Sequence, residues 1–187
     1  DAYPLLEAAI KELENVPQYQ KKQEEYKLTY GKIISNMGSY YYQKREYEEA
    51  LKWHKKALEF RKLSLPDRVM DSYRTIMSDY FCMKQYEKGY ETYREAIKKT
   101  QPDALFLVRA IGCELCLLKE KKEENLEKQI LEELPVQIER VVELAVSNRR
   151  KNVGVLKDLQ KKLEELEAWT ELQELVKEYR IKIEEYL

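Results

Sequence analysis

Apolar residues recur among polar ones along this 187-residue chain with the period of an α-helix. No segment alternates with a period of two for long enough to predict a β-strand. Pro17, Pro66, Pro102 and Pro135 separate the helical patterns, as expected where proline occupies a first helical turn or a short link. The predicted fold class is all-α, with helices over residues 2–14, 18–43, 46–63, 67–83, 86–99, 103–119, 123–147 (a break at Pro135 being left open), 152–166 and 168–186.

Composition excludes several classes of function. The 34 basic and 35 acidic residues leave a net charge of −1, so no overall field attracts nucleic acid or an anionic membrane. No apolar run approaches the roughly 20 residues of a membrane-spanning helix. Three cysteines do not form a disulfide framework, which favours a reducing cytoplasm. The chain begins with Asp1 rather than Met, so we expect a fragment of a longer protein.

Small and aromatic residues recur at fixed steps in "GSYYYQKREYEEALKWHKKAL", residues 38–58. Tyr47, Ala50 and Ala57 reappear 39 residues later as Tyr86, Gly89 and Ala96, and Tyr41 reappears as Tyr80. Pro66 and Pro102 follow the second helix of each unit. The stretch therefore predicts an internal repeat.

This spacing resembles the tetratricopeptide repeat (TPR). The resemblance implies that the small residues let two antiparallel helices approach closely and that the aromatic residues fill the spaces between neighbouring hairpins, so the stretch is specified by packing. The resemblance is most specific over 31–64 and 70–102, where Met77 replaces the usual glycine and Gly89 the usual alanine. It implies a right-handed superhelix of antiparallel helix hairpins forming a single α-solenoid domain over residues 1–187, with degenerate hairpins over 103–147 and a capping hairpin over 152–187. The second-helix spacing also occurs at both ends of the chain, at Tyr3, Leu6, Ile10 and Leu13 and at Trp169, Leu172, Val176 and Tyr179. The chain is thus expected to begin inside a hairpin, which supports the fragment hypothesis.

The resemblance further implies that a peptide or protein segment binds the concave face, which the first helix of each hairpin lines. The predicted peptide-binding residues are Lys32, Ser35, Asn36, Ser39, Tyr42 and Gln43 in the first repeat and Asp71, Arg74, Ser78 and Phe81 in the second, with Thr75 and Cys82 on the same face. Such amides, hydroxyls and isolated charges suit hydrogen bonding to an extended backbone. A solvated groove without a ligand is the alternative. Ser35 and Ser39 stand where chaperone adaptors have a lysine and an asparagine, which disfavours that subclass.

Other candidate sites have structural interpretations. Cys113 and Cys116 share a helix face but no nearby histidine, so we interpret them as buried small residues rather than a redox pair or half a zinc site. His54 falls between Ala50 and Ala57 and is predicted to be a core or boundary residue rather than a catalytic one. The basic run "SNRRKN", 147–152, suits a helix end, with an anionic partner as the alternative. No phosphate-binding loop, nucleophile elbow or metal-ligand cluster appears, so we expect neither an enzyme nor a cofactor.

The abundance of Lys, Glu, Tyr and Ile and the 39-residue step resemble the regulatory domains of Gram-positive peptide-sensing proteins, the Rap-type phosphatases and PlcR-, NprR- and Rgg-like transcription regulators. In that group a short signalling peptide binds the concave face and asparagines hold its backbone. The resemblance implies such a role for Asn36, with Asn148 or Asn152 as a second contact, in quorum-sensing transcription regulation. No helix-turn-helix is visible in these residues. A constitutive interaction scaffold is the alternative, and a homodimer stays open.

Overall fold

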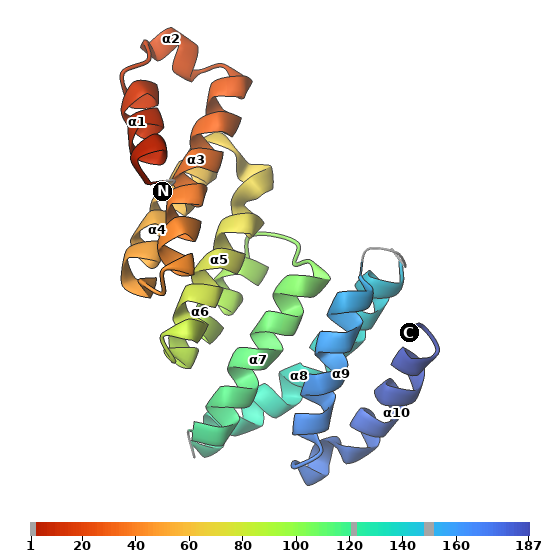
Figure 1. Cartoon of the computed structure of the whole chain (residues 1–187). Coiled ribbons are helices and arrows are strands. Elements are labelled where there is room, and N and C mark those ends of the chain that lie inside the picture. Colours follow the sequence, from red (N-terminus) through yellow and green to blue (C-terminus); the bar gives the residue numbers. More distant parts are fainter. Residues whose placement is uncertain (1–2, 121–122, 148–151) are drawn as a thin grey trace. The chain divides into compact units, whose positions relative to one another are not determined.

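The computed structural model describes residues 3–120, 123–147 and 152–187, and every regular element in these ranges is helical (Figure 1). The all-α prediction is therefore confirmed. The helices are α1 (Tyr3–Glu14), α2 (Gln18–Lys21), α3 (Glu24–Gln43), α4 (Tyr47–Ser64), the 3₁₀ turn η1 (Pro66–Arg68), α5 (Val69–Cys82), α6 (Tyr86–Ile97), α7 (Ala104–Glu120), α8 (Glu124–Val146), α9 (Val153–Leu166), the 3₁₀ turn η2 (Thr170–Leu172) and α10 (Gln173–Glu184). None of the described helices combines the length and the apolar character needed to cross a bilayer.

Two compact units make up the chain, Asp1–Thr100 and Gln101–Leu187. In the first unit α1 packs against α3, and α3, α4, α5 and α6 pack in order, each against the next. In the second unit α9 lies between α7 and α10 (Figure 1), and α8 packs against all three. The single-solenoid prediction for residues 1–187 stays a prediction.

Two predicted helix boundaries change in the structure, and the break left open at Pro135 does not occur. The helix predicted over 18–43 is two helices, because Gln23 is extended (φ −69°, ψ 141°) and the chain turns there so that α3 can pack on α1. Tyr26 on α3 donates to the Leu13 carbonyl on α1 at 3.2 Å. Pro135 does not interrupt α8, since the helix buries Leu134 and Ile138 on either side of it. Near the carboxyl end, an extended Trp169 delays the last α-helix to Gln173.

The two hairpins of the first unit turn in the same way. Arg45 (φ 63°) and Lys84 (φ 57°), 39 residues apart, both adopt the left-handed conformation. Each turn has the two nested hydrogen bonds of a Schellman motif. Arg45 and Glu46 donate to the carbonyls of Tyr42 and Tyr41 at 3.0 Å each, and Lys84 and Gln85 donate to those of Phe81 and Tyr80 at 3.0 and 2.9 Å. These bonds satisfy the last carbonyls of α3 and α5 and fix where α4 and α6 begin.

Small residues hold α3 close to α4. Ala50 and Ala57 on α4 are fully buried, and Gly38 on α3 faces the ring of His54. His54 Nδ1 is hydrogen-bonded to Asp79 Oδ2 on α5 at 2.6 Å, and neither side chain is more than 2% exposed. Burial raises the pKa of the Asp79 carboxyl, and its hydrogen bond to His54 acts in the opposite direction. The prediction that His54 belongs to the core is confirmed, and its carboxylate partner is a new finding.

The second unit also encloses a polar pair. Glu114 on α7 is fully buried, and its Oε1 accepts a hydrogen bond from Gln137 Nε2 on α8 at 2.6 Å. Burial raises the pKa of Glu114 to about 8, with a smaller contribution in the same direction from the charge of Glu133. The carboxyl is therefore protonated at neutral pH, which removes the cost of a buried charge.

The close contact between Gly38 and His54 predicts that position 38 does not tolerate a side chain. A Cβ at Gly38 would lie 2.4 Å from His54 Cδ2, so Gly38→Ala must displace the ring and leave Asp79 without its partner. We expect the free energy of unfolding to fall by at least about 1 kcal/mol, although alanine favours a helix by up to about 1 kcal/mol over glycine. Urea denaturation would measure the loss. Gly154→Ala is the control, because no described atom outside its own helix turn lies within 4 Å of its added Cβ. Equal tolerance of both substitutions would contradict this packing.

The raised pKa of Glu114 predicts a pH-dependent stability. Between pH 4.5 and about 8 the folded chain keeps a proton that an unfolded carboxyl of ordinary pKa has lost. The free energy of unfolding therefore falls with rising pH in this window, by about 1.4 kcal/mol per pH unit from this group. Glu114→Gln cannot ionise at this position. The free energy of unfolding of the variant minus that of the parent chain should therefore increase from pH 4.5 to about 8. Parallel stability curves from pH 4.5 to 8 would show that Glu114 ionises normally.

Candidate functional site

The residues predicted to bind a peptide lie on α3 and α5, and none of them is buried. On α3, Lys32, Asn36 and Gln43 are exposed and Ser35, Ser39 and Tyr42 are half-buried; on α5, Phe81 is exposed and Asp71, Arg74 and Ser78 are half-buried. We call these residues, with Thr75 and Cys82, the α3–α5 face. Their exposure allows contact with a ligand. Their use in binding stays a prediction.

Hydroxyl groups occupy matching positions on the two helices. Ser39 Oγ donates to the Ser35 carbonyl at 3.1 Å, and Ser78 Oγ donates to the Arg74 carbonyl at 2.9 Å. Each hydroxyl hydrogen is thus used within its own helix. The lone pairs of the Ser39 oxygen are what this residue can offer to N–H groups of a ligand.

One end of the α3–α5 face is aromatic. The rings of Tyr42 and Tyr47 meet edge to face with centroids 5.4 Å apart, and Phe81 and Tyr86 repeat that geometry at 5.4 Å. The Tyr42 hydroxyl lies 3.1 Å from Cys82 Sγ, which joins α3 to α5 directly. The structure therefore brings together two residues, Tyr42 and Cys82, that are 40 positions apart in the sequence.

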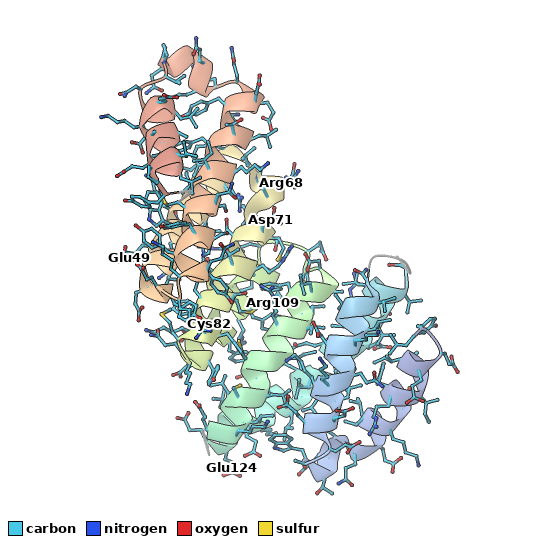
Figure 2. The ribbon with its side chains drawn as sticks, viewed as in Figure 1. Glu49, Arg68, Asp71, Cys82, Arg109 and Glu124 are labelled. Carbon is cyan, nitrogen blue, oxygen red and sulfur yellow. The ribbon has the colours of Figure 1, made fainter. Side chains whose placement is uncertain are left out.

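The other end of the face is charged and hollow. Lys32 and Asp71 line a cavity of about 260 Å³, together with Leu28, Gly31, Arg61, Leu65 and Arg68. Asp71 Oδ1 accepts a hydrogen bond from Arg74 Nη2 at 3.4 Å, and Arg68 Nη1 lies 3.9 Å from Asp71 Oδ2. Figure 2 shows Arg68 and Asp71 near each other and Cys82 further along, at the other end of α5. We call this hollow the Arg61 cavity.

Arg61 is the residue of this region that the sequence analysis missed. Its side chain is buried, with the residue only 8% exposed, and Nη1 donates to Ser72 Oγ on α5 at 2.8 Å. Nε has no hydrogen-bond partner among the described residues. Burial lowers the pKa of the guanidinium, and the nearby Asp71 carboxylate partly offsets this. The available signal was its position seven residues after His54 and four after Ala57, on the buried stripe of α4, where a charged residue is rare.

The remaining sequence candidates lie elsewhere. Cys113 is buried and burial raises its pKa to about 12, whereas Cys116 is half-buried. Asn152 donates from Nδ2 to the Leu144 carbonyl at 3.4 Å, and Asn148 and most of the basic run 147–152 lie outside the described residues. Among the residues that the structure describes, no three or more His, Cys, Asp or Glu side chains form a group that could hold a metal ion. The His54–Asp79 pair is enclosed, so a substrate could not reach it without a rearrangement of α3.

The exposures of the thiols predict different reactivities. Cys82 is half-buried on the α3–α5 face, whereas Cys113 is buried with a raised pKa. Because the thiolate is the reactive form, iodoacetamide should modify Cys82 at least about tenfold faster than Cys113 in the folded chain at neutral pH. Mass spectrometry of protease digests would assign each site, with the urea-unfolded chain as the reference. Equal rates in the folded chain would contradict the assigned burial.

A scan against protein-family models finds no match, and searches of the curated proteins and of the solved structures find none either.

Proposed function

We propose that this chain is a tetratricopeptide-like solenoid that binds an extended peptide or protein segment along the α3–α5 face. One observation carries the proposal: the hairpins α3–α4 and α5–α6 use the same left-handed turn, with the same hydrogen bonds, at a spacing of 39 residues. This recurrence supports a repeated hairpin, and it gives α3 and α5 equivalent roles as first helices. The right-handed superhelix implied by the resemblance belongs to this proposal.

The chemistry of the face supports a peptide as the ligand. The exposed amide of Asn36 carries both a donor and an acceptor, which suits a backbone N–H and C=O of an extended chain. The Ser39 oxygen can accept a further N–H group, and the aromatic end offers ring surface to an apolar side chain. The finer proposal is a ligand-sensing role like that of the peptide-sensing regulators, in which binding shifts the chain between two packings of its hairpins.

Peptide binding is tested with peptides selected from a random library displayed on their own messenger RNA. We expect Asn36→Ala to weaken binding of the selected peptides about fivefold, as loss of about 1 kcal/mol of hydrogen bonding implies, with the melting temperature nearly unchanged. Asn125→Ala, an exposed asparagine on α8, is the matched control and should bind normally. Bound peptide should also slow the modification of Cys82.

Two results would contradict the proposal. One is a library that yields no peptide, and the other is a set of peptides whose affinity is unaffected by Asn36→Ala and which leave Cys82 reactive. Small-angle scattering of the chain with a saturating selected peptide then distinguishes a ligand-sensing role from that of a constitutive scaffold. A changed profile supports sensing, whereas an unchanged profile favours a constitutive scaffold.

A further inference from the structure

The Arg61 cavity combines a buried cation with apolar walls at one end of the α3–α5 face. We propose that this cavity binds a carboxylate group, and that it holds the terminal or side-chain carboxylate of the peptide ligand. The second part rests on the proposed peptide binding; the first part does not. The site is distinct from Ser35 and Ser39, whose positions hold the carboxylate-binding residues of chaperone adaptors.

The charges that line the cavity favour a single anionic group. Lys32, Arg61 and Arg68 contribute three cations, and Asp71 contributes one carboxylate. Asp71 is already engaged by Arg74 and lies within ion-pair distance of Arg68. Within the part of the chain that the structure describes, neither Lys32 nor Arg61 has a carboxylate within 4.0 Å of its nitrogens. Two cations therefore face the cavity without a close counter-ion.

Arg61 is the lining residue that most strongly favours a bound carboxylate. A buried donor without an acceptor is costly, and the Arg61 Nε–H is such a donor. The lowered pKa of the guanidinium has the same origin, since burial disfavours its charge. A carboxylate in the cavity would supply the counter-charge that the guanidinium lacks. The planar guanidinium fork matches the two oxygens of a carboxylate, so Arg61 is well suited to this ligand.

The walls indicate what is attached to the carboxylate. Leu28, Leu65 and the backbone at Gly31 form an apolar side, and a Cβ at Gly31 would lie 3.2 Å from Leu65 Cδ1. A neighbouring hollow of about 570 Å³ shares Leu28, Leu65 and Arg68 with the cavity and adds the acidic residues Glu24 and Asp67. This acidic extension disfavours a second negative group. The ligand is therefore expected to carry one carboxylate next to apolar or neutral atoms, rather than a phosphate dianion.

The first test uses small carboxylates and does not need the peptide. In ¹H–¹⁵N spectra of the whole chain, sodium propionate should shift the Arg61 Nε–H resonance in a saturable manner, with a dissociation constant on the order of millimolar because so small a ligand binds weakly. Sodium chloride at equal ionic strength is the control and should give no saturable shift. Absence of a saturable shift with propionate would overturn the proposal. A larger response to inorganic phosphate would replace the carboxylate assignment with a phosphoryl group.

Variants separate binding from folding. Arg61→Met fills the same space without charge, and replacing a buried ion by an apolar residue is often neutral or stabilising. We expect this variant to keep or raise its melting temperature. Because it lacks the Arg61 Nε–H, the reporter is the backbone amide of Gly31 in the cavity lining, which propionate should shift in the parent chain and not in the variant. Lys32→Ala, a change at an exposed position, should weaken propionate binding about two- to fivefold, and Lys11→Ala on α1 should not. If Arg61→Met fails to fold, the Lys32→Ala variant still tests the site. An unchanged propionate affinity of Lys32→Ala would contradict the proposal.

Selected peptides then test the second part. A peptide whose terminus is bound should lose about tenfold in affinity when made as the carboxyl-terminal amide, and one bound through a side chain should do so on Glu→Gln or Asp→Asn replacement. If propionate binds but neither change matters, the cavity takes carboxylates without taking that of the peptide. If no peptide is selected at all, the peptide-binding proposal fails, while the propionate result still stands.

Discussion

The contact among Gly38, His54 and Asp79 fixes the three helices on which the rest of the first unit depends. Without a Cβ, Gly38 lets α3 approach α4 until the His54 ring fills the space between them. The same ring is tied to Asp79, which comes from α5. α3 and α5 carry the α3–α5 face on their exposed sides, so a buried polar contact sets the spacing of a solvent-facing surface. A shift of the histidine ring would move both helices.

The second hairpin reaches the same turn with a different interior. Met77 stands 39 residues after Gly38, and Tyr93 stands 39 residues after His54. Both are buried, with Met77 fully enclosed. A flexible thioether and a larger ring thus replace an absent side chain and a smaller ring. The backbone turn is therefore the repeated feature, and each interior is packed by its own set of residues.

The sequence predicted the helical class and most helix positions because helical periodicity depends on local spacing. It predicted the surface position of the α3–α5 face for the same reason, through the 39-residue register. It could not predict that α3 starts at Glu24 or that α8 continues through Pro135, because packing between helices decides both. The His54–Asp79 pair was also out of reach, since its members lie on different helices, 25 residues apart. Arg61 was visible only as a charge on an otherwise buried stripe.

Arg61 also shows why stability and function can be in conflict at one residue. A guanidinium on the buried stripe of α4 donates one hydrogen bond to Ser72 Oγ, yet its Nε stays unpaired and its charge is poorly solvated. An apolar side chain there would pack at least as well. In the proposed complex the ligand carboxylate compensates this cost, so the residue that weakens the free chain strengthens the bound one. The contact of the Tyr42 hydroxyl with Cys82 Sγ marks the opposite end of the face, and the two chemically different ends would give an extended ligand a single orientation.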